Sequence, residues 1–182
     1  MNRLIKSLPF LLAALACSSS SAADLSCAQQ MGQQRATLLA QQCRQVSPAT
    51  HPPCNAANSC AMIIDEFERG CNMLEGESSR PKFCVAKARA GSFRGYLFHG
   101  GGIDDRFVTV LTDQGDRIFA YCIRQCDDLF SEPDDHDAIT LREDLVGKRV
   151  AVQVAVERNA DRIAGPGNDE RIPLVKHIKL LK

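Results

Sequence analysis

Two segments in the first third of the chain repeat their apolar residues at helical spacing. The first covers residues 25–45, and the second runs from about Asn58, a good N-cap, to about Leu74. The proline-rich stretch of residues 47–53 stops the first segment. We therefore predict two antiparallel helices. Their apolar faces consist of Cys27, Met31, Leu38, Leu39 and Cys43 in the first segment, and of Cys60, Ile63, Ile64, Phe67, Cys71 and Leu74 in the second.

From residue 91 onward the apolar pattern changes to a period of two, which is typical of half-buried strands. The three glycines of residues 100–102 are expected to form a turn after the first strand. Residues 113–116 are expected to form a tight hairpin connection, and residues 138–145 a short helical stretch. The predicted strands cover residues 93–98, 106–112, 117–123, 150–157 and 172–181.

Three strands, a connection with a short helix and two further strands resemble an OB-fold over residues 91–182. The resemblance depends on Gly95 in a bent first strand, on Val-Leu-Thr-Asp-Gln-Gly at 110–115, and on Leu-Val-Gly-Lys-Arg-Val-Ala-Val at 145–152. It points especially to the OB-fold proteins that bacteria export to the periplasm. A different small β-sandwich or an open meander is the alternative.

The break between the two patterns falls within residues 76–90, where glycine, serine and proline interrupt regular structure. The predicted fold class is therefore α+β. A disulfide-stapled helical hairpin with its linker occupies residues 24–90, and a five-stranded OB-like β-barrel occupies residues 91–182.

The first 23 residues have the pattern of a secretory signal peptide. Arg3 and Lys6 precede an apolar run that is too short to span a bilayer, and small residues lead to a cut before Asp24. We predict no transmembrane segment and a periplasmic location. Cys17 lies in an imperfect lipoprotein box, so a lipid anchor in the outer membrane is the alternative to simple cleavage.

Eight cysteines remain after removal of residues 1–23, and an even number in an exported chain predicts a disulfide framework. In an antiparallel hairpin Cys27 should meet Cys71, and Cys43 should meet Cys54 or Cys60. Cys122 and Cys126 are expected to pair with each other, or one of them with Cys84. The disulfide candidates are Cys27, Cys43, Cys54, Cys60, Cys71, Cys84, Cys122 and Cys126.

Known catalytic and metal-binding patterns find no good match in the sequence. His-Gly-Gly-Gly at 99–102 resembles the oxyanion strip of lipases, but the required G-x-S-x-G is missing. Cys122 and Cys126 are too far apart for a C-x-x-C redox motif. The acidic cluster lacks the ligand spacing of an EF-hand and is interpreted as a solvated loop. We therefore predict no catalytic residue, cofactor or metal ligand. The cluster comprises Asp127, Asp128, Glu132, Asp134, Asp135, His136 and Asp137.

The charge of residues 91–182 argues against nucleic acid as a ligand, because this segment has 13 basic and 16 acidic residues and therefore a net negative charge. The leading hypothesis is a non-catalytic cell-envelope protein that binds an unidentified protein or glycan. An inhibitor or immunity protein against a lytic enzyme is a sharper version, whereas a small periplasmic hydrolase and a metal-handling role are the alternatives. The candidate binding face is Phe93, Tyr96, Phe98, Phe107, Phe119 and Tyr121, although strands this apolar also fill small barrels.

Overall fold

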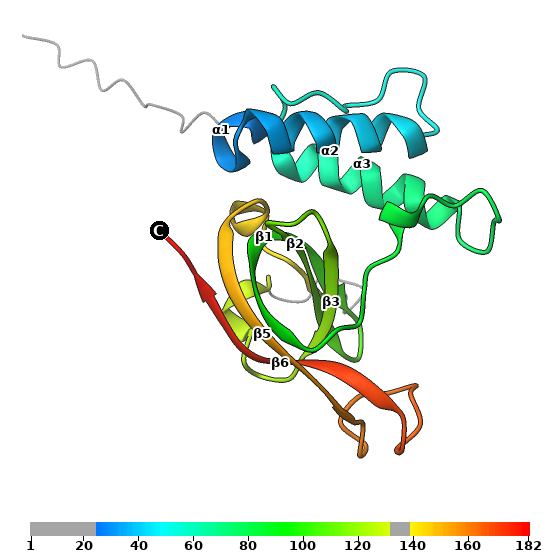
Figure 1. The fold of residues 1–182 in the computed structure, drawn as a ribbon, viewed down its shortest axis with the longest axis vertical. Helices are drawn as coiled ribbons and strands as arrows, with labels where there is room; N and C mark the ends of the chain where they lie inside the picture. The colour runs from blue at the N-terminus through cyan, green and yellow to red at the C-terminus, as the bar shows by residue number, and fades with distance from the viewer. Residues whose placement is uncertain (1–24, 132–138) are drawn as a thin grey trace, which may run out of the picture.

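The computed structural model describes residues 25–131 and 139–182. Three helices form one unit, which lies against one side of a β-barrel (Figure 1). The α+β class, with disulfide-linked helices followed by a five-stranded barrel, is confirmed. The proposed signal peptide and Cys17 lie outside the described residues.

The helical unit consists of α1 (Cys27–Met31), α2 (Gln33–Val46) and α3 (Cys60–Met73). Gly32, with a φ of 87°, separates α1 from α2 and so divides the single helix predicted for residues 25–45. Ser59, rather than Asn58, is the N-cap of α3, and its side chain accepts a hydrogen bond from the Met62 backbone.

The prediction that the two long helices are antiparallel is wrong. The end of α2 lies beside the end of α3, where Gly70 is so close to Val46 that an added Cβ would come within 2.5 Å of the Val46 carbonyl oxygen. Residues 47–59 return along the helices to the start of α3 (Figure 1). Their thirteen residues are long enough for this return, because a 14-residue helix is only about 21 Å long.

The parallel arrangement also explains the disulfide connectivity. Cys27 pairs with Cys60 instead of the predicted Cys71, because the beginnings of α1 and α3 are neighbours and the Cys27 amide donates to the Asn58 carbonyl at 2.7 Å. Cys43–Cys54 and Cys122–Cys126 match pairings expected from the sequence, and Cys71 pairs with Cys84. All eight candidate cysteines are therefore in disulfides, which indicates an oxidising compartment outside the cytoplasm.

The barrel closes through the strand sequence β1–β2–β3–β6–β5–β1. All of these neighbours are antiparallel except β3 and β6, which form a parallel pairing at Tyr121 and Leu174. Their interior side chains are mainly valine, isoleucine and leucine. The barrel strands are β1 (Gly91–Gly102), β2 (Arg106–Thr112), β3 (Arg117–Cys122), β5 (Arg149–Arg158) and β6 (Arg171–Leu180).

Of two predictions about the connections, one is wrong and the other is correct only for its last residues. Residues 100–102 do not form a turn but continue β1, where Gly100 pairs with Val108, and an added Cβ at Gly100 would come within 2.8 Å of the Phe107 carbonyl oxygen. The described part of residues 138–145 forms the short strand β4 (Ile139–Thr140), which pairs with the end of β1, and a 3-10 turn (Glu143–Leu145). The last residues of β1 carry no side chain, so two strands can approach them closely.

The helical unit packs against the outer face of the barrel at the β1–β2–β3 side. Tyr96 and Phe98 of β1 belong to the same apolar cluster as the buried residues of α2 and α3. Tyr96 lies between the guanidinium groups of Arg35 and Arg149, 5.2 and 4.8 Å from the ring centre. Its hydroxyl donates to the Met31 carbonyl. The helices therefore share a core with the barrel wall.

Candidate binding surface

The six aromatic residues of the predicted binding face divide into three groups in the structure. Tyr96 and Phe98 are buried beneath the helical unit, with 7% and 1% of their surface exposed. Phe107, Phe119 and Tyr121 are half-buried and lie together on the outer face of β2 and β3. Phe93 lies on the opposite face of β1, where it is partly buried against the barrel interior. The structure therefore brings together three of the six.

The covered half of the β1–β2–β3 face comprises Tyr96, Phe98, Leu111 and Arg117. Arg117 lies between the rings of Phe67 and Phe98, 5.1 and 4.9 Å from their centres. It donates to the carbonyls of Phe83 and Cys84 at 3.2 and 3.1 Å and forms an ion pair with Glu68 of α3. These contacts connect β3 to the helices, so this half has a structural role.

The other half of the same face carries an aromatic strip, which we define as His99, Phe107, Phe119 and Tyr121. The ring centres of successive members are 5.6, 5.3 and 4.9 Å apart. Phe119 and Tyr121 meet edge to face, with an interplanar angle of 82°. Because these side chains contact one another, the strip forms one continuous surface across β1, β2 and β3.

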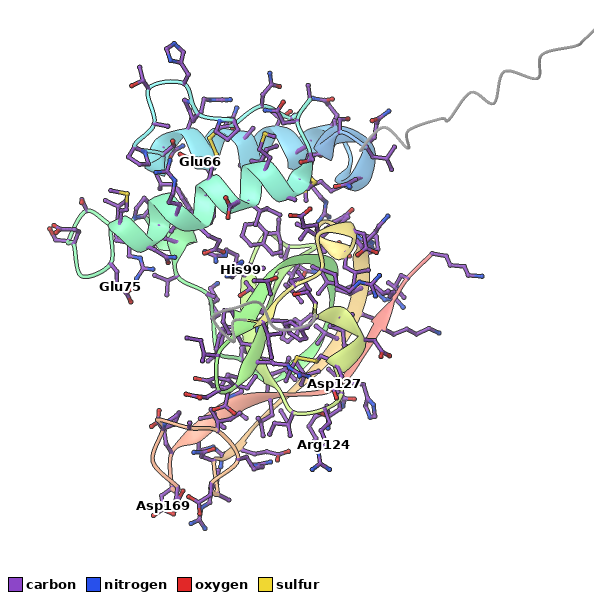
Figure 2. All side chains as sticks on the ribbon, turned by 180° about the vertical axis from the view of Figure 1, so that it is seen from behind. Glu66, Glu75, His99, Arg124, Asp127 and Asp169 are labelled. Atoms are coloured by element: carbon purple, nitrogen blue, oxygen red, sulfur yellow. A yellow bond between two sulfur atoms is a disulfide. The ribbon has the colours of Figure 1, made fainter. Side chains whose placement is uncertain are left out.

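His99 is the member of the strip that sequence reasoning missed. Its place in the His-Gly-Gly-Gly sequence drew attention to a turn, whereas the structure places it within β1, opposite Thr109 of β2. Figure 2 shows His99 near the border between the helical unit and the barrel. Strict alternation from the buried Leu97 would place His99 toward the barrel interior, but a β-bulge between Leu97 and His99 turns it to the same face as Phe107. Periodicity in the sequence therefore gave no signal for this residue.

Two loops border the far end of the strip. Asp105, in the loop between β1 and β2, accepts a hydrogen bond from the Ala164 amide of the β5–β6 loop. Burial raises the pKa of the Tyr121 hydroxyl above its ordinary value, and the nearby carboxylates of Asp105 and Glu170 raise it further. The surroundings of this end of the strip are therefore negatively charged.

Ile103 adds an exposed apolar side chain at the tip of the β1–β2 loop. Its exposed fraction is 69%, the highest among the exposed large apolar residues of the described chain. The Gly101–Phe107 pairing and the Asp105–Ala164 hydrogen bond place this loop at the end of the aromatic strip. Ile103 is thus an exposed apolar side chain in the loop that follows β1.

The other sequence motifs do not form a reactive site in the described chain. Cys122 and Cys126 are buried in a disulfide. Asp127 pairs with Arg106, and Figure 2 shows Asp127 and Arg124 at the outside of the barrel. Asp128 follows Asp127 in the short 3-10 helix Asp127–Leu129 and is exposed, whereas Glu132, Asp134, Asp135, His136 and Asp137 lie outside the described residues.

Comparison with protein-family models, with curated proteins and with solved structures finds no match to this chain. Within residues 25–131 and 139–182, every helix is too short or too polar to cross a lipid bilayer. The assignment of a function therefore depends on the geometry of the surfaces described above.

Proposed function

We propose that this chain is a non-catalytic binding protein of the bacterial cell envelope, exported to the periplasm, which recognises a protein or glycan through the aromatic strip. The observation that carries this proposal is the division of one sheet face into a covered and an open half. The helices cover Tyr96 and Phe98, but they leave Phe107, Phe119 and Tyr121 in contact with solvent. A group of touching aromatic rings that stays partly exposed to solvent favours a contact surface.

The position of the strip agrees with the resemblance to OB-folds. Such barrels bind their ligands on the outer face of the second and third strands, between the loops that follow the first and fourth strands. In this chain those elements are β2, β3, the β1–β2 loop and the β5–β6 loop. Phe107, Phe119 and Tyr121 lie on that face, and His99 of β1 contacts Phe107 at its border. Asp105 and Ala164 join the two loops beside it.

The charges around the strip favour a ligand other than nucleic acid. Asp105 and Glu170 act on Tyr121, so a phosphate backbone placed here would meet negative charge. Of the two proposed ligand classes, a protein fits better, because exposed Ile103 and the aromatic rings resemble the apolar anchors of protein interfaces. If this chain is an inhibitor of a lytic enzyme, its ligand is of this class, because the enzyme is a protein.

The test compares three forms of the full chain, expressed with its own leader and purified from the envelope. The wild type, Phe119→Ala/Tyr121→Ala and the control Leu38→Ala are immobilised and exposed to an envelope extract and to a glycan array. Leu38 is 50% exposed on α2, away from the strip. We expect the strip variant to lose a ligand that the wild type and the control both retain. Equal retention by all three forms would exclude the strip as the binding surface.

A further inference from the structure

A second surface with different chemistry lies on the outer face of β1, β5 and β6. The strand register places Ser92, Gln153 and His177 in one row across these strands, and Arg94, Ala151 and Lys179 in another, two residues along. Together with Asp113 and Gln114 of the β2–β3 turn, these side chains line a groove of about 550 Å³. We call this surface the cationic groove.

The shape of the groove follows from the sizes of the residues in each row. Ala151 lies between Arg94 and Lys179, so a small side chain forms the floor while two long ones form the sides. The backbone of β5 is hydrogen-bonded to β1 on one side and to β6 on the other. A ligand in the groove must therefore be recognised by side chains rather than by addition of a strand to β5.

The charge of the groove is positive and uncompensated. Arg94 and Lys179 are exposed, and neither forms a salt bridge with any residue in the described part of the chain. Asp113 is the carboxylate in the lining, and it already accepts hydrogen bonds from Arg149, at 2.6 and 3.3 Å, and pairs with Arg35. Two free cations beside a neutralised carboxylate attract anions.

The neutral side chains of the groove indicate which kind of anion fits. Ser92, Gln114 and Gln153 offer hydroxyl and amide groups, each of which can both donate and accept hydrogen bonds. Sugar hydroxyls have the same dual capacity. We propose that the cationic groove binds an acidic oligosaccharide, with its carboxylates on Arg94 and Lys179 and its hydroxyls on the amides and Ser92. This second surface is independent of the aromatic strip.

The experiment uses the purified full chain and calorimetric titration with three probes of equal length. They are a hexamer of 1,4-linked uronic acids prepared from alginate, a neutral 1,4-linked glucose hexamer, and hexaglutamate. We expect saturable binding of the uronic acid hexamer and at least tenfold weaker binding of the other two, because each of them lacks either the charge or the hydroxyls.

Matched variants show where that binding occurs. Arg94→Gln and Lys179→Gln should each weaken binding of the uronic acid hexamer by about tenfold, through loss of one charge-assisted hydrogen bond. Lys82→Gln changes the net charge equally on an exposed residue outside the groove and should leave affinity within about twofold. All three positions are exposed, so the variants should retain the melting temperature of the wild type.

Three results would overturn the proposal. These are the absence of binding to the uronic acid hexamer, equal binding of hexaglutamate, and equal loss of affinity in Lys82→Gln and the groove variants. The strip variant Phe119→Ala/Tyr121→Ala separates this proposal from the proposed function. It should bind the uronic acid hexamer as the wild type does, and a loss there would assign the glycan to the strip instead of the groove.

Discussion

The two halves of the β1–β2–β3 face have different roles. Both carry aromatic side chains that point away from the barrel interior, yet Phe98 is 1% exposed while Phe119 remains half-buried. The difference lies outside the strands, because Phe67 of α3 covers Phe98, with ring centres 5.4 Å apart. An aromatic residue on an outer sheet face can thus belong to a core or to a binding surface, depending on which element packs there.

The largest expected effect is on stability and comes from the covered half. Phe98→Ala should lower the free energy of unfolding by about 3–5 kcal/mol, because it removes the ring that contacts both Phe67 and Arg117. Phe119→Ala, in the open half, should cost about 1 kcal/mol. Urea unfolding followed by circular dichroism measures both values. Equal costs for the two substitutions would contradict the division of this face.

The disulfide between Cys27 and Cys60 should have the next largest effect. Removing it in Cys27→Ala/Cys60→Ala should destabilise the protein by roughly 3–4 kcal/mol, because its half-cystines are 33 residues apart in sequence. The Cys122–Cys126 bond spans only 4 residues, and its removal should cost about 2 kcal/mol. Thermal unfolding of the two double variants tests this order, and the reverse order would contradict it.

Thiol labelling provides a sharper check on the same connectivity. In the single variant Cys71→Ala, Cys84 should become the reactive thiol under denaturing, non-reducing conditions, while Cys27 stays protected. Labelling of Cys27 in this variant would contradict the Cys27–Cys60 pairing and support the antiparallel helices that the sequence predicts.

The smallest effect concerns pH and lies within the helical unit. Burial raises the pKa of Glu66, but hydrogen bonds from Ser47 and Arg69 outweigh it and hold the pKa below its ordinary value. A lowered carboxyl pKa contributes stability above the ordinary value of about 4.3, and this contribution is lost as the pH falls through the folded-state pKa. The unfolding free energies of wild type and Glu66→Gln should therefore differ more at pH 7 than at pH 3.

Glu75→Gln is the matched control for this measurement. Glu75 is an exposed residue after α3, whereas Glu66 is buried within the helix, and Figure 2 labels both. The control should differ little from the wild type at either pH. If the difference in unfolding free energy between wild type and Glu66→Gln is the same at pH 7 and at pH 3, the role given to the Glu66 carboxylate is contradicted.

The sequence predicted most of the elements and the barrel, because local patterns determine them. The strand bounds of β2 agree at both ends, and every predicted strand overlaps an observed one. The direction of α3 could not be predicted, since it depends on the path of residues 47–59 between the helices. The pairing of Cys27 was wrong for the same reason.

The candidate surface was predicted only in part, because periodicity reports which side of a strand a residue occupies and not what covers it. Tyr96 and Phe98 were grouped with Phe107, Phe119 and Tyr121 on the strength of residue type. The packing of the helices, which buries the first two, involves residues that are distant in sequence. Arg117 illustrates the same limit, because an arginine in a strand gave no sign that it would lie between two phenylalanine rings.

The central claim is that the open half of this sheet face contacts a ligand in the envelope. The most direct measurement replaces Phe119, and separately Leu38, with the photoreactive amino acid benzoylphenylalanine in the full chain and irradiates intact cells. We predict a covalent adduct of increased mass from position 119 and none from position 38. Adducts of equal yield at both positions, or none at position 119, would contradict the claim.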